Sequence, residues 1–150
     1  MSELSELYQE VILDHNKHPR NFCELPDCTN SADGYNPLCG DRVSVFVRLK
    51  DDRIEDISFL GNGCAISKAS ASMMTDALKG MHKNDAESLF RDVHEMLTGK
   101  SDGDLDADSL GKLIALSGVC EFPVRVKCAT LAWHTMRNAI EGGKDQAKTE

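Results

Sequence analysis

The hydrophobic pattern of the chain begins with a helical period. Over residues 2–18, apolar side chains recur three and four positions apart, and Pro19 follows. This spacing predicts an amphipathic helix that stops at the proline. Residues 21–35 have no clear period and contain Pro26 and Gly34. For that stretch we expect irregular chain with one short strand at the edge of a sheet.

The next two segments alternate between apolar and polar residues, which predicts a β-hairpin. Residues 42–50 and 54–60 form the strands, and the polar residues 51–53 form a three-residue loop. The apolar residues of both strands must share one face, because a slip of one position would turn one set to solvent. The register that satisfies this requirement pairs Val47 with Ile57 and Val45 with Phe59.

The same register brings two distant motifs together at the open end of the hairpin. It places Asp41 opposite Gly63 and Gly40 opposite Cys64. Cys39 then lies within a residue or two of Cys64.

Helical periods return after the hairpin. The signals at the ends of these segments are Asn84 as an N-cap with Glu87 three positions later, Gly99 as a stop, and Pro123 in a first turn. The polar residues 100–108 predict a surface loop. The predicted helices cover residues 64–79, 84–97, 109–117 and 123–141.

The order of a helix, strands and then helices indicates an α+β fold. We expect a small antiparallel sheet of about three strands packed against about five α-helices. A length of 150 residues suits one domain over 1–150. Flexible tails are expected at 1–3 and 142–150.

Composition argues against several classes of protein. An aromatic content of 5%, a net charge of −8 and the absence of a basic run argue against nucleic acid as a partner. No apolar run is long enough for a signal peptide or a membrane span, so a cytoplasmic protein without a membrane partner is expected. In a reducing compartment, six cysteines favour thiols or metal ligands over disulfides.

Three of the cysteines fall where the predicted fold can bring them together. Cys39 and Asp41 lie on a tight loop that enters a strand, Cys64 begins a helix, and Cys128 faces inward on the last helix. Three thiolates and a carboxylate suit tetrahedral zinc. The spacing from Cys39 to Asp41 is not that of a zinc knuckle, so the hairpin register carries most of the argument for a shared site.

Each of these residues also has a simpler interpretation. Cys64 lies at a helix N-terminus, where the dipole favours a thiolate, but it could be a packed core thiol. Cys39 is the thiol best placed to be exposed and nucleophilic, but it could be a turn residue. Asp41 could instead cap the turn.

Several other polar residues could take part in the site. Arg125 lies one helical turn before Cys128, and Lys127 is next to it, so both could offset the negative charge of four anionic ligands or simply be solvated. Aspartates at every second position of 102–108 do not form a calcium loop, because Ala107 stands in place of the required glycine. Structural or incidental thiols are expected at Cys23, Cys28 and Cys120, and packed or solvated imidazoles at His15, His18, His82, His94 and His134.

Several motifs together resemble the U-type iron–sulfur cluster assembly proteins over nearly the whole chain. The C-terminal motif narrows the resemblance to the SufU branch. Lys127 stands at the position where the IscU branch has a histidine. Pro123 is a single proline, whereas the IscU branch has a proline-rich chaperone-recognition sequence there. The segment 100–108 also resembles an insertion typical of SufU-type proteins. The matching motifs are Leu7-Tyr8 with Val11-Ile12, Asp14-His15, Pro19-Arg20-Asn21, Asn36-Pro37 with Cys39-Gly40-Asp41, Gly63-Cys64-Ala65-Ile66 with Ala69-Ser70-Ala71-Ser72-Met73-Met74, and Phe122-Pro123 with Arg125-Val126-Lys127-Cys128-Ala129-Thr130-Leu131-Ala132-Trp133-His134.

The resemblance implies an enzyme, a zinc-dependent sulfurtransferase, with zinc held by Cys39, Asp41, Cys64 and Cys128. It implies that Cys39 accepts persulfide sulfur from a SufS-type cysteine desulfurase, which is a pyridoxal-phosphate enzyme, and that the sulfur passes to downstream Suf assembly proteins. In this family, release of Cys39 from zinc is proposed to accompany entry of a desulfurase histidine into its place.

Two other functions remain open at this point. The same four residues could hold a transient iron–sulfur cluster on a scaffold protein, because thiolates suit both kinds of centre. The chain could also be a zinc-stabilised interaction domain without transfer chemistry.

Overall fold

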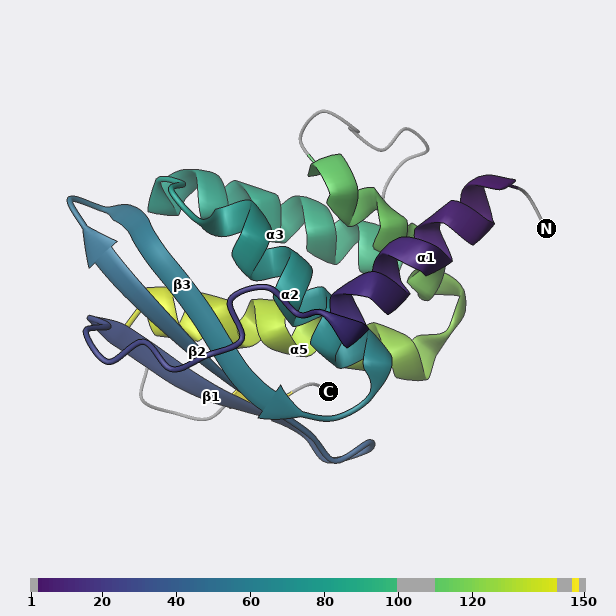
Figure 1. The fold of residues 1–150 in the computed structure, drawn as a ribbon, viewed down its shortest axis with the longest axis horizontal. Coiled ribbons are helices and arrows are strands. Elements are labelled where there is room, and N and C mark those ends of the chain that lie inside the picture. Colours follow the sequence, from purple (N-terminus) through teal and green to yellow (C-terminus); the bar gives the residue numbers. More distant parts are fainter. Residues whose placement is uncertain (1–2, 100–109, 143–146, 149–150) are drawn as a thin grey trace.

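The computed structural model describes residues 3–99, 110–142 and 147–148, and it has the predicted α+β fold. An antiparallel sheet lies on one side of the molecule, and the helices cover one of its faces (Figure 1). The elements in chain order are α1 (Glu3–Lys17), β1 (Asn30–Asn36), β2 (Asp41–Lys50), β3 (Arg53–Asn62), α2 (Ala65–Leu78), α3 (Lys83–Thr98), the 3₁₀ helix η1 (Gly111–Glu121), α5 (Pro123–Ile140) and β4 (Ala147–Lys148).

The sheet has the strand order β3-β2-β1-β4. Strands β1, β2 and β3 are antiparallel, and the two residues of β4 pair in parallel with β1. The short strand expected within 21–35 is therefore confirmed as β1. Part of the segment expected to be a flexible tail forms β4, and residues 143–146 and 149–150 lie outside the described part of the chain.

The predicted pairing of β2 with β3 is confirmed, but the predicted loop is wrong. Val47 faces Ile57 and Val45 faces Phe59, as expected. The turn has two residues, Asp51 and Asp52, with φ of 53° and 62°. Two left-handed residues give a turn whose twist matches that of the flanking strands. A register shift between Arg48 and Leu49 then adds one residue to β3, so the rest of the ladder keeps the predicted register.

The core lies between the sheet and the helices. Val43, Val45 and Val47 point from β2 into this core and are at most 4% exposed. Helix α5 packs on β1 and β2, and α2 packs on β3 and α5. A buried hydrogen-bond chain joins the two helices, since Trp133 Nε1 donates to Ser70 Oγ at 3.2 Å and Ser70 Oγ donates to the carbonyl of Ala129 at 2.6 Å. This chain fixes α5 next to the position of Cys128.

The start of α3 differs from the prediction. His82, not Asn84, is the N-cap, and its Nδ1 accepts the Asn84 N–H at 3.1 Å. The helix begins early because the Lys83 N–H donates to the carbonyl of Asp52 at 2.8 Å, which ties the helix start to the hairpin turn. Glu87 is paired with Arg137 at 3.4 Å instead of completing a capping box. Gly99 ends the helix with φ 74°, as expected.

The α-helix expected over 109–117 is instead the 3₁₀ helix η1. Leu113, Leu116 and Val119 recur every third position and form an apolar stripe with Leu110, which matches three residues per turn, and Ala115 is buried beside this stripe. The loop expected at 100–108 lies outside the described residues. Among the described helices, none is long and apolar enough to cross a membrane. The buried stripe consists of Leu110, Leu113, Leu116 and Val119.

Candidate metal centre

Cys39 lies on the four-residue loop that connects β1 and β2. Asn36 and Asp41 face each other as the pair that closes the two strands, and the loop between them is exposed at Cys39. Two hydrogen bonds shape the loop: the Gly40 N–H donates to the carbonyl of Asn36 at 2.8 Å, and the Leu38 N–H donates to Asn36 Oδ1 at 3.1 Å. The loop therefore presents its thiol to solvent from an ordered base.

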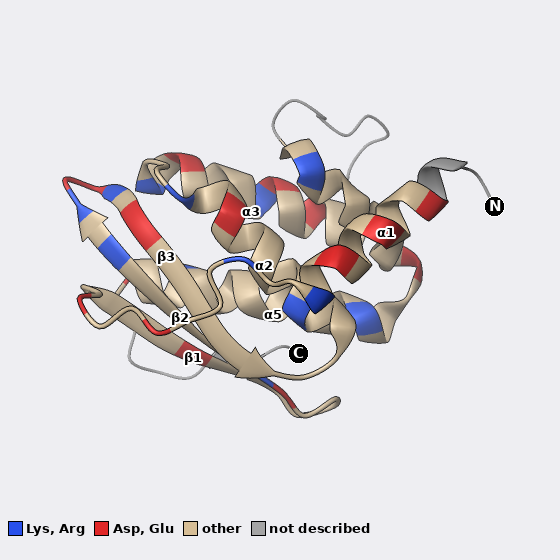
Figure 2. Cartoon of the chain, viewed as in Figure 1, with Lys and Arg blue, Asp and Glu red and all other residues tan. Residues whose placement is uncertain are grey.

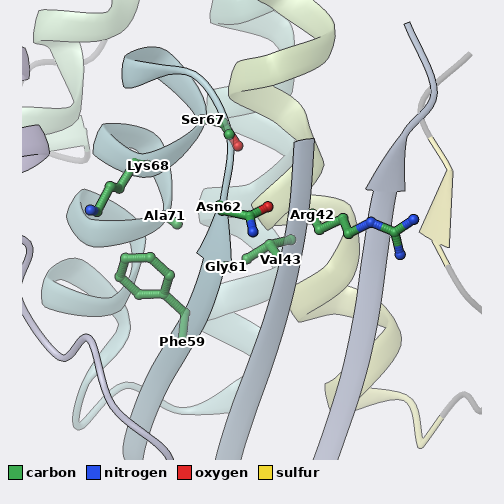
Figure 3. Close-up of a pocket in the computed structure, with 9 residues that line it drawn as sticks. Arg42, Val43, Phe59, Gly61, Asn62, Ser67, Lys68 and Ala71 are labelled. Atoms are coloured by element: carbon green, nitrogen blue, oxygen red, sulfur yellow. The ribbon is translucent and has the colours of Figure 1, made fainter. Parts of the chain in front are cut away.

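Asp41 is fully buried and bridges to the start of α2. Its Oδ1 accepts the Cys64 N–H at 2.8 Å, and its Oδ2 lies 3.7 Å from Cys64 Sγ. Gly63 permits this approach, because a Cβ at that position would lie 2.3 Å from Asp41 Oδ1. Figure 3 shows Asn62 at the end of β3 and Ser67 in the first turn of α2. The predicted neighbourhood of Asp41 and Cys64 is confirmed, and one carboxylate oxygen is held while the other faces the thiol.

Cys64 is the N-cap of α2. Its Sγ accepts the N–H of Ser67 at 3.4 Å. An N-cap acceptor at the positive end of the helix dipole stabilises negative charge on the sulfur. The backbone thus fixes Cys64 at two points, through its own N–H to Asp41 and through its sulfur to α2.

Cys128 is the buried thiol of the group, at 2% exposure on the inward face of α5. Its Sγ lies 3.5 Å from Cys39 Sγ, and Asn36 Nδ2 donates to it at 3.7 Å. Burial raises the pKa of this thiol far above the usual range, and contacts with Asp41, Cys39 and Cys64 raise it further. Without a metal, Cys128 is therefore a neutral thiol, and metal binding would have to displace its proton.

These side chains have the donor set and spacing of a tetrahedral site. One ligand atom each from Cys39, Asp41 and Cys128 lies within 4.8 Å of the others. Zinc–ligand bond lengths and tetrahedral angles require sulfur atoms roughly 3.8 Å apart and sulfur and oxygen roughly 3.5 Å apart. The observed 3.5 Å between Cys39 and Cys128 and 3.7 Å between Cys64 and Asp41 are close to these lengths. Three of the four predicted ligands, Cys39, Asp41 and Cys128, therefore lie together at spacings that suit a metal ion, and Cys64 lies outside this group but contacts Asp41.

The remaining candidates lie farther out or elsewhere. Arg125 is exposed and lies over the ring of Phe122, 4.9 Å from its centroid. Lys127 is half-buried. His15 is a packed imidazole whose Nδ1 hydrogen-bonds Ser72 Oγ at 2.8 Å. Cys23, Cys28 and Cys120 do not belong to the cluster and are exposed or half-buried, and the aspartates of 102–108 lie outside the described residues.

A groove of about 750 Å³ opens beside the cluster. It is lined by α1, η1, the first turns of α2 and α5, and the thiols Cys39, Cys64 and Cys128. Leu13, Phe122 and Val124 also line it, and each is about half exposed. Figure 2 shows acidic positions along α1 and basic positions at the start of α5. The thiols thus lie at one end of an apolar surface with charged margins.

Asn36 begins the Cys39 motif, but no role for it was predicted from the sequence. Its side chain contacts both the Cys39 loop and Cys128. An asparagine directly before a proline at a strand end is a turn signal, and that signal could have pointed to the contact with the loop. The contact with Cys128 depends on the packing of α5 and has no local signal.

Known proteins match this chain over most of its length. The family model described as the NifU-like N terminal domain matches residues 7–129. The zinc-dependent sulfurtransferase SufU of Bacillus subtilis is 44% identical over 95% of this chain and 97% of its own length. The iron–sulfur cluster assembly scaffold protein IscU of Streptococcus pyogenes serotype M1 is 43% identical over 94% of this chain and 87% of its own length.

A solved structure agrees with the sequence matches. The putative iron–sulfur cluster assembly scaffold protein for the SUF system from Fervidobacterium islandicum superimposes with a TM-score of 0.82 and 32% identity, over 90% of this chain and 97% of that one. The relatives carry both scaffold and sulfurtransferase names, so the names alone do not decide between the two activities. The fold and the thiol cluster agree with these matches. The family model and the relatives together show that the chain belongs to the NifU-like N-terminal domain family of iron–sulfur cluster assembly proteins.

Proposed function

We propose that the chain is a zinc-dependent sulfurtransferase that accepts persulfide sulfur from a cysteine desulfurase and delivers it to iron–sulfur cluster assembly. The observation that carries the proposal is the difference in exposure among three clustered thiols. Cys39 is exposed on a loop, Cys64 caps a helix, and Cys128 is buried. A relay needs one thiol that can reach a partner and others that keep the site together.

Cys39, Asp41, Cys64 and Cys128 would hold the zinc. The bound ion would keep the thiols as thiolates at neutral pH, protected from oxidation until a partner arrives. Cys64 and Cys128 are anchored in helices, and Asp41 is anchored by the Cys64 N–H. These three ligands would stay in place when Cys39 leaves.

The transfer step is a thiol–persulfide exchange. The Cys39 thiolate attacks the outer sulfur of the partner's cysteine persulfide, the partner's sulfur–sulfur bond breaks, and its cysteine leaves as a thiolate. The proton on the outer sulfur stays with it, and no net oxidation occurs. Cys39 then carries the persulfide, ready for a second exchange with a downstream Suf assembly protein.

The groove beside the thiols supports the proposal that the sulfur donor is a protein. Leu13, Phe122 and Val124 form an apolar surface beside the thiols, and exposed patches of this kind are typical of docking sites. A SufS-type pyridoxal-phosphate desulfurase would bring its persulfide to Cys39 across this surface. Arg125, at the margin, would offset the negative charge of the site or hold the displaced Cys39 thiolate.

A scaffold function is the second candidate. The thiols Cys39 and Cys128, with Cys64 in contact with Asp41, would also suit an iron–sulfur cluster, and IscU relatives are named as scaffolds. The buried carboxylate of Asp41 favours zinc, because iron–sulfur clusters are held mainly by cysteine thiolates, whereas zinc also takes carboxylate oxygen. A zinc-stabilised interaction domain would share the metal but show no sulfur transfer.

Metal analysis of protein purified without oxygen tests the proposal. We expect one zinc per chain and no visible absorption band, and we expect the protein to accept sulfur when it is incubated with a desulfurase and cysteine. Removing the zinc should lower the melting temperature by about 10 °C, because metal binding adds to folding stability. Stoichiometric iron and sulfide with a coloured spectrum would support the scaffold instead. Zinc without sulfur acceptance would support the interaction domain.

A further inference from the structure

Asn36 makes three hydrogen bonds beside the candidate metal site while being fully buried. Its carbonyl oxygen accepts the Gly40 N–H at 2.8 Å, and its Oδ1 accepts the Leu38 N–H at 3.1 Å. Its Nδ2 donates to Cys128 Sγ at 3.7 Å. One residue therefore holds the loop of Cys39 on both sides and also contacts the deepest thiol. We propose that Asn36 is a positioning residue that keeps Cys128 and the base of the loop fixed while Cys39 leaves and returns to the metal.

The contact with Cys128 is costly to lose. A buried amide without a partner loses its hydration without compensation, so the amide group of Asn36 needs the sulfur as its acceptor. A hydrogen bond to a charged acceptor is stronger than one to a neutral group, and Cys128 becomes charged when it binds a metal. The Asn36 N–H therefore stabilises the metal-bound form of Cys128 more than the free thiol. It also offsets part of the excess negative charge that four anionic ligands place around a dication.

The contacts with the loop leave Cys39 as the residue that can move. Leu38 and Gly40 are each tied to Asn36 through their N–H groups. Gly40 has φ of 75°, a conformation that glycine adopts at little cost, and a Cβ there would meet no atom within 4 Å. Because Cys39 itself is exposed, its side chain can turn toward solvent while the base of the loop stays anchored. The same amide group that anchors this base holds Cys128 Sγ, 3.5 Å from Cys39 Sγ, so departure of one thiol need not release the other.

The inference deepens the proposed sulfur transfer, but its test uses the metal alone. Three changes at Asn36 separate the two contacts. Asn36→Ser keeps a short side-chain acceptor for the Leu38 N–H and is too short to reach Cys128. Asn36→Asp keeps the acceptor and replaces the donor by a negative oxygen, and Asn36→Ala removes both contacts. Asn30→Ala is the matched control, because Asn30 lies on the same strand and donates its side-chain N–H to the carbonyl of Ala139 in α5 at 2.8 Å.

The measurements are zinc affinity by chelator competition, the absorption spectrum of the cobalt-substituted protein, and the sites of limited alkylation by mass spectrometry. We expect Asn36→Ser to bind zinc about tenfold more weakly, with Asn36→Asp weaker still. In both, the sulfur-to-cobalt band should shift while alkylation stays selective for Cys39. Asn36→Ala should lose this selectivity as well. Asn30→Ala should melt at a lower temperature with unchanged affinity and spectrum.

Two results would overturn the inference. One is an Asn36→Ser protein with the affinity and cobalt spectrum of the parent. The other is an Asn30→Ala protein that changes as much as Asn36→Ser, which would reduce the role of Asn36 to general stability. Because none of these measurements requires sulfur transfer, a parent protein that accepts no sulfur would contradict the proposed function and leave this inference intact.

Discussion

The two halves of the candidate metal site are built in different ways. One half is a turn between β1 and β2, where Cys39 is exposed and Gly40 next to it has open space around it. The other half consists of two helix positions, where Cys64 is fixed by backbone hydrogen bonds and Cys128 is buried. Three thiols of equal intrinsic chemistry thus have different freedom, and under the proposed function that difference would separate a thiol that can meet a partner from thiols that hold a metal.

Replacing each thiol in turn is the strongest test of this comparison. Cys39→Ser should abolish the sulfur adduct and the stimulation of a desulfurase, while some zinc stays on the other three ligands. Cys64→Ser and Cys128→Ser should lose zinc, because each removes an anchored thiolate. Mass spectrometry of peptides after incubation with desulfurase and cysteine locates the adduct. An adduct on Cys64 or Cys128 of the parent protein, with Cys39 unmodified, would reverse the assignment.

A change at Gly63 tests the fixed half without touching a thiol. An added methyl group would lie 2.3 Å from Asp41 Oδ1, so Gly63→Ala must push the carboxylate or the start of α2 aside. We expect a loss of about 1–3 kcal/mol in the free energy of unfolding, together with weaker zinc binding. Denaturant unfolding and chelator competition measure the two effects.

Gly118→Ala is the control for that change. A Cβ at Gly118 meets no atom within 4 Å, and its φ does not lie in the left-handed region. This variant should keep the parent's zinc affinity and change the free energy of unfolding by less than about 1 kcal/mol. Equal zinc affinities in Gly63→Ala and Gly118→Ala would mean that the close approach of Gly63 to Asp41 does not matter for the metal.

The sequence predicted the convergence of the two halves because that convergence follows from strand register. Alternation fixed which residues of β2 and β3 face the core, and only one register keeps Val45 and Val47 buried opposite Ile57 and Phe59. The predicted register is correct although the predicted loop length is wrong, because a bulge in β3 compensates for the shorter turn. Burial of a whole strand face outweighs the local choice of turn.

Other features depended on contacts between elements that are distant in the chain. The N-cap His82 follows from the hydrogen bond that ties Lys83 to the hairpin turn, and local capping rules favoured Asn84 instead. The prediction for 109–117 was an α-helix, whereas the spacing of three between Leu113, Leu116 and Val119 favours the observed 3₁₀ helix. Asn36 reaches Cys128 only because α5 packs against β1, so no local pattern could predict that contact.

Arg125 tests the exposed half of the site, with a smaller expected effect. Its guanidinium is exposed over Phe122 at the margin of the groove. Arg125→Ala should slow sulfur acceptance up to about fivefold and leave zinc content unchanged, since exposed charge pairs contribute at most about 1 kcal/mol. Transfer rates at low and high salt, with Lys127→Ala alongside, measure the contribution. Rates equal to those of the parent at low salt would mean that Arg125 is only a solvated side chain.

The smallest expected effect concerns Cys128 in the metal-free protein. Burial and its neighbours raise the folded-state pKa of this thiol above the value in the unfolded chain. The folded state therefore holds the proton more tightly, and the resulting stabilisation is complete below the unfolded pKa of about 8.5 and declines as the pH rises above it. The zinc-bound protein should not show this decline, because its Cys128 is already a thiolate. Denaturant midpoints of the metal-free parent should thus fall more between about pH 8 and pH 10 than those of metal-free Cys128→Ser. Parallel curves for the two proteins would show that the buried thiol does not contribute to the pH dependence of folding.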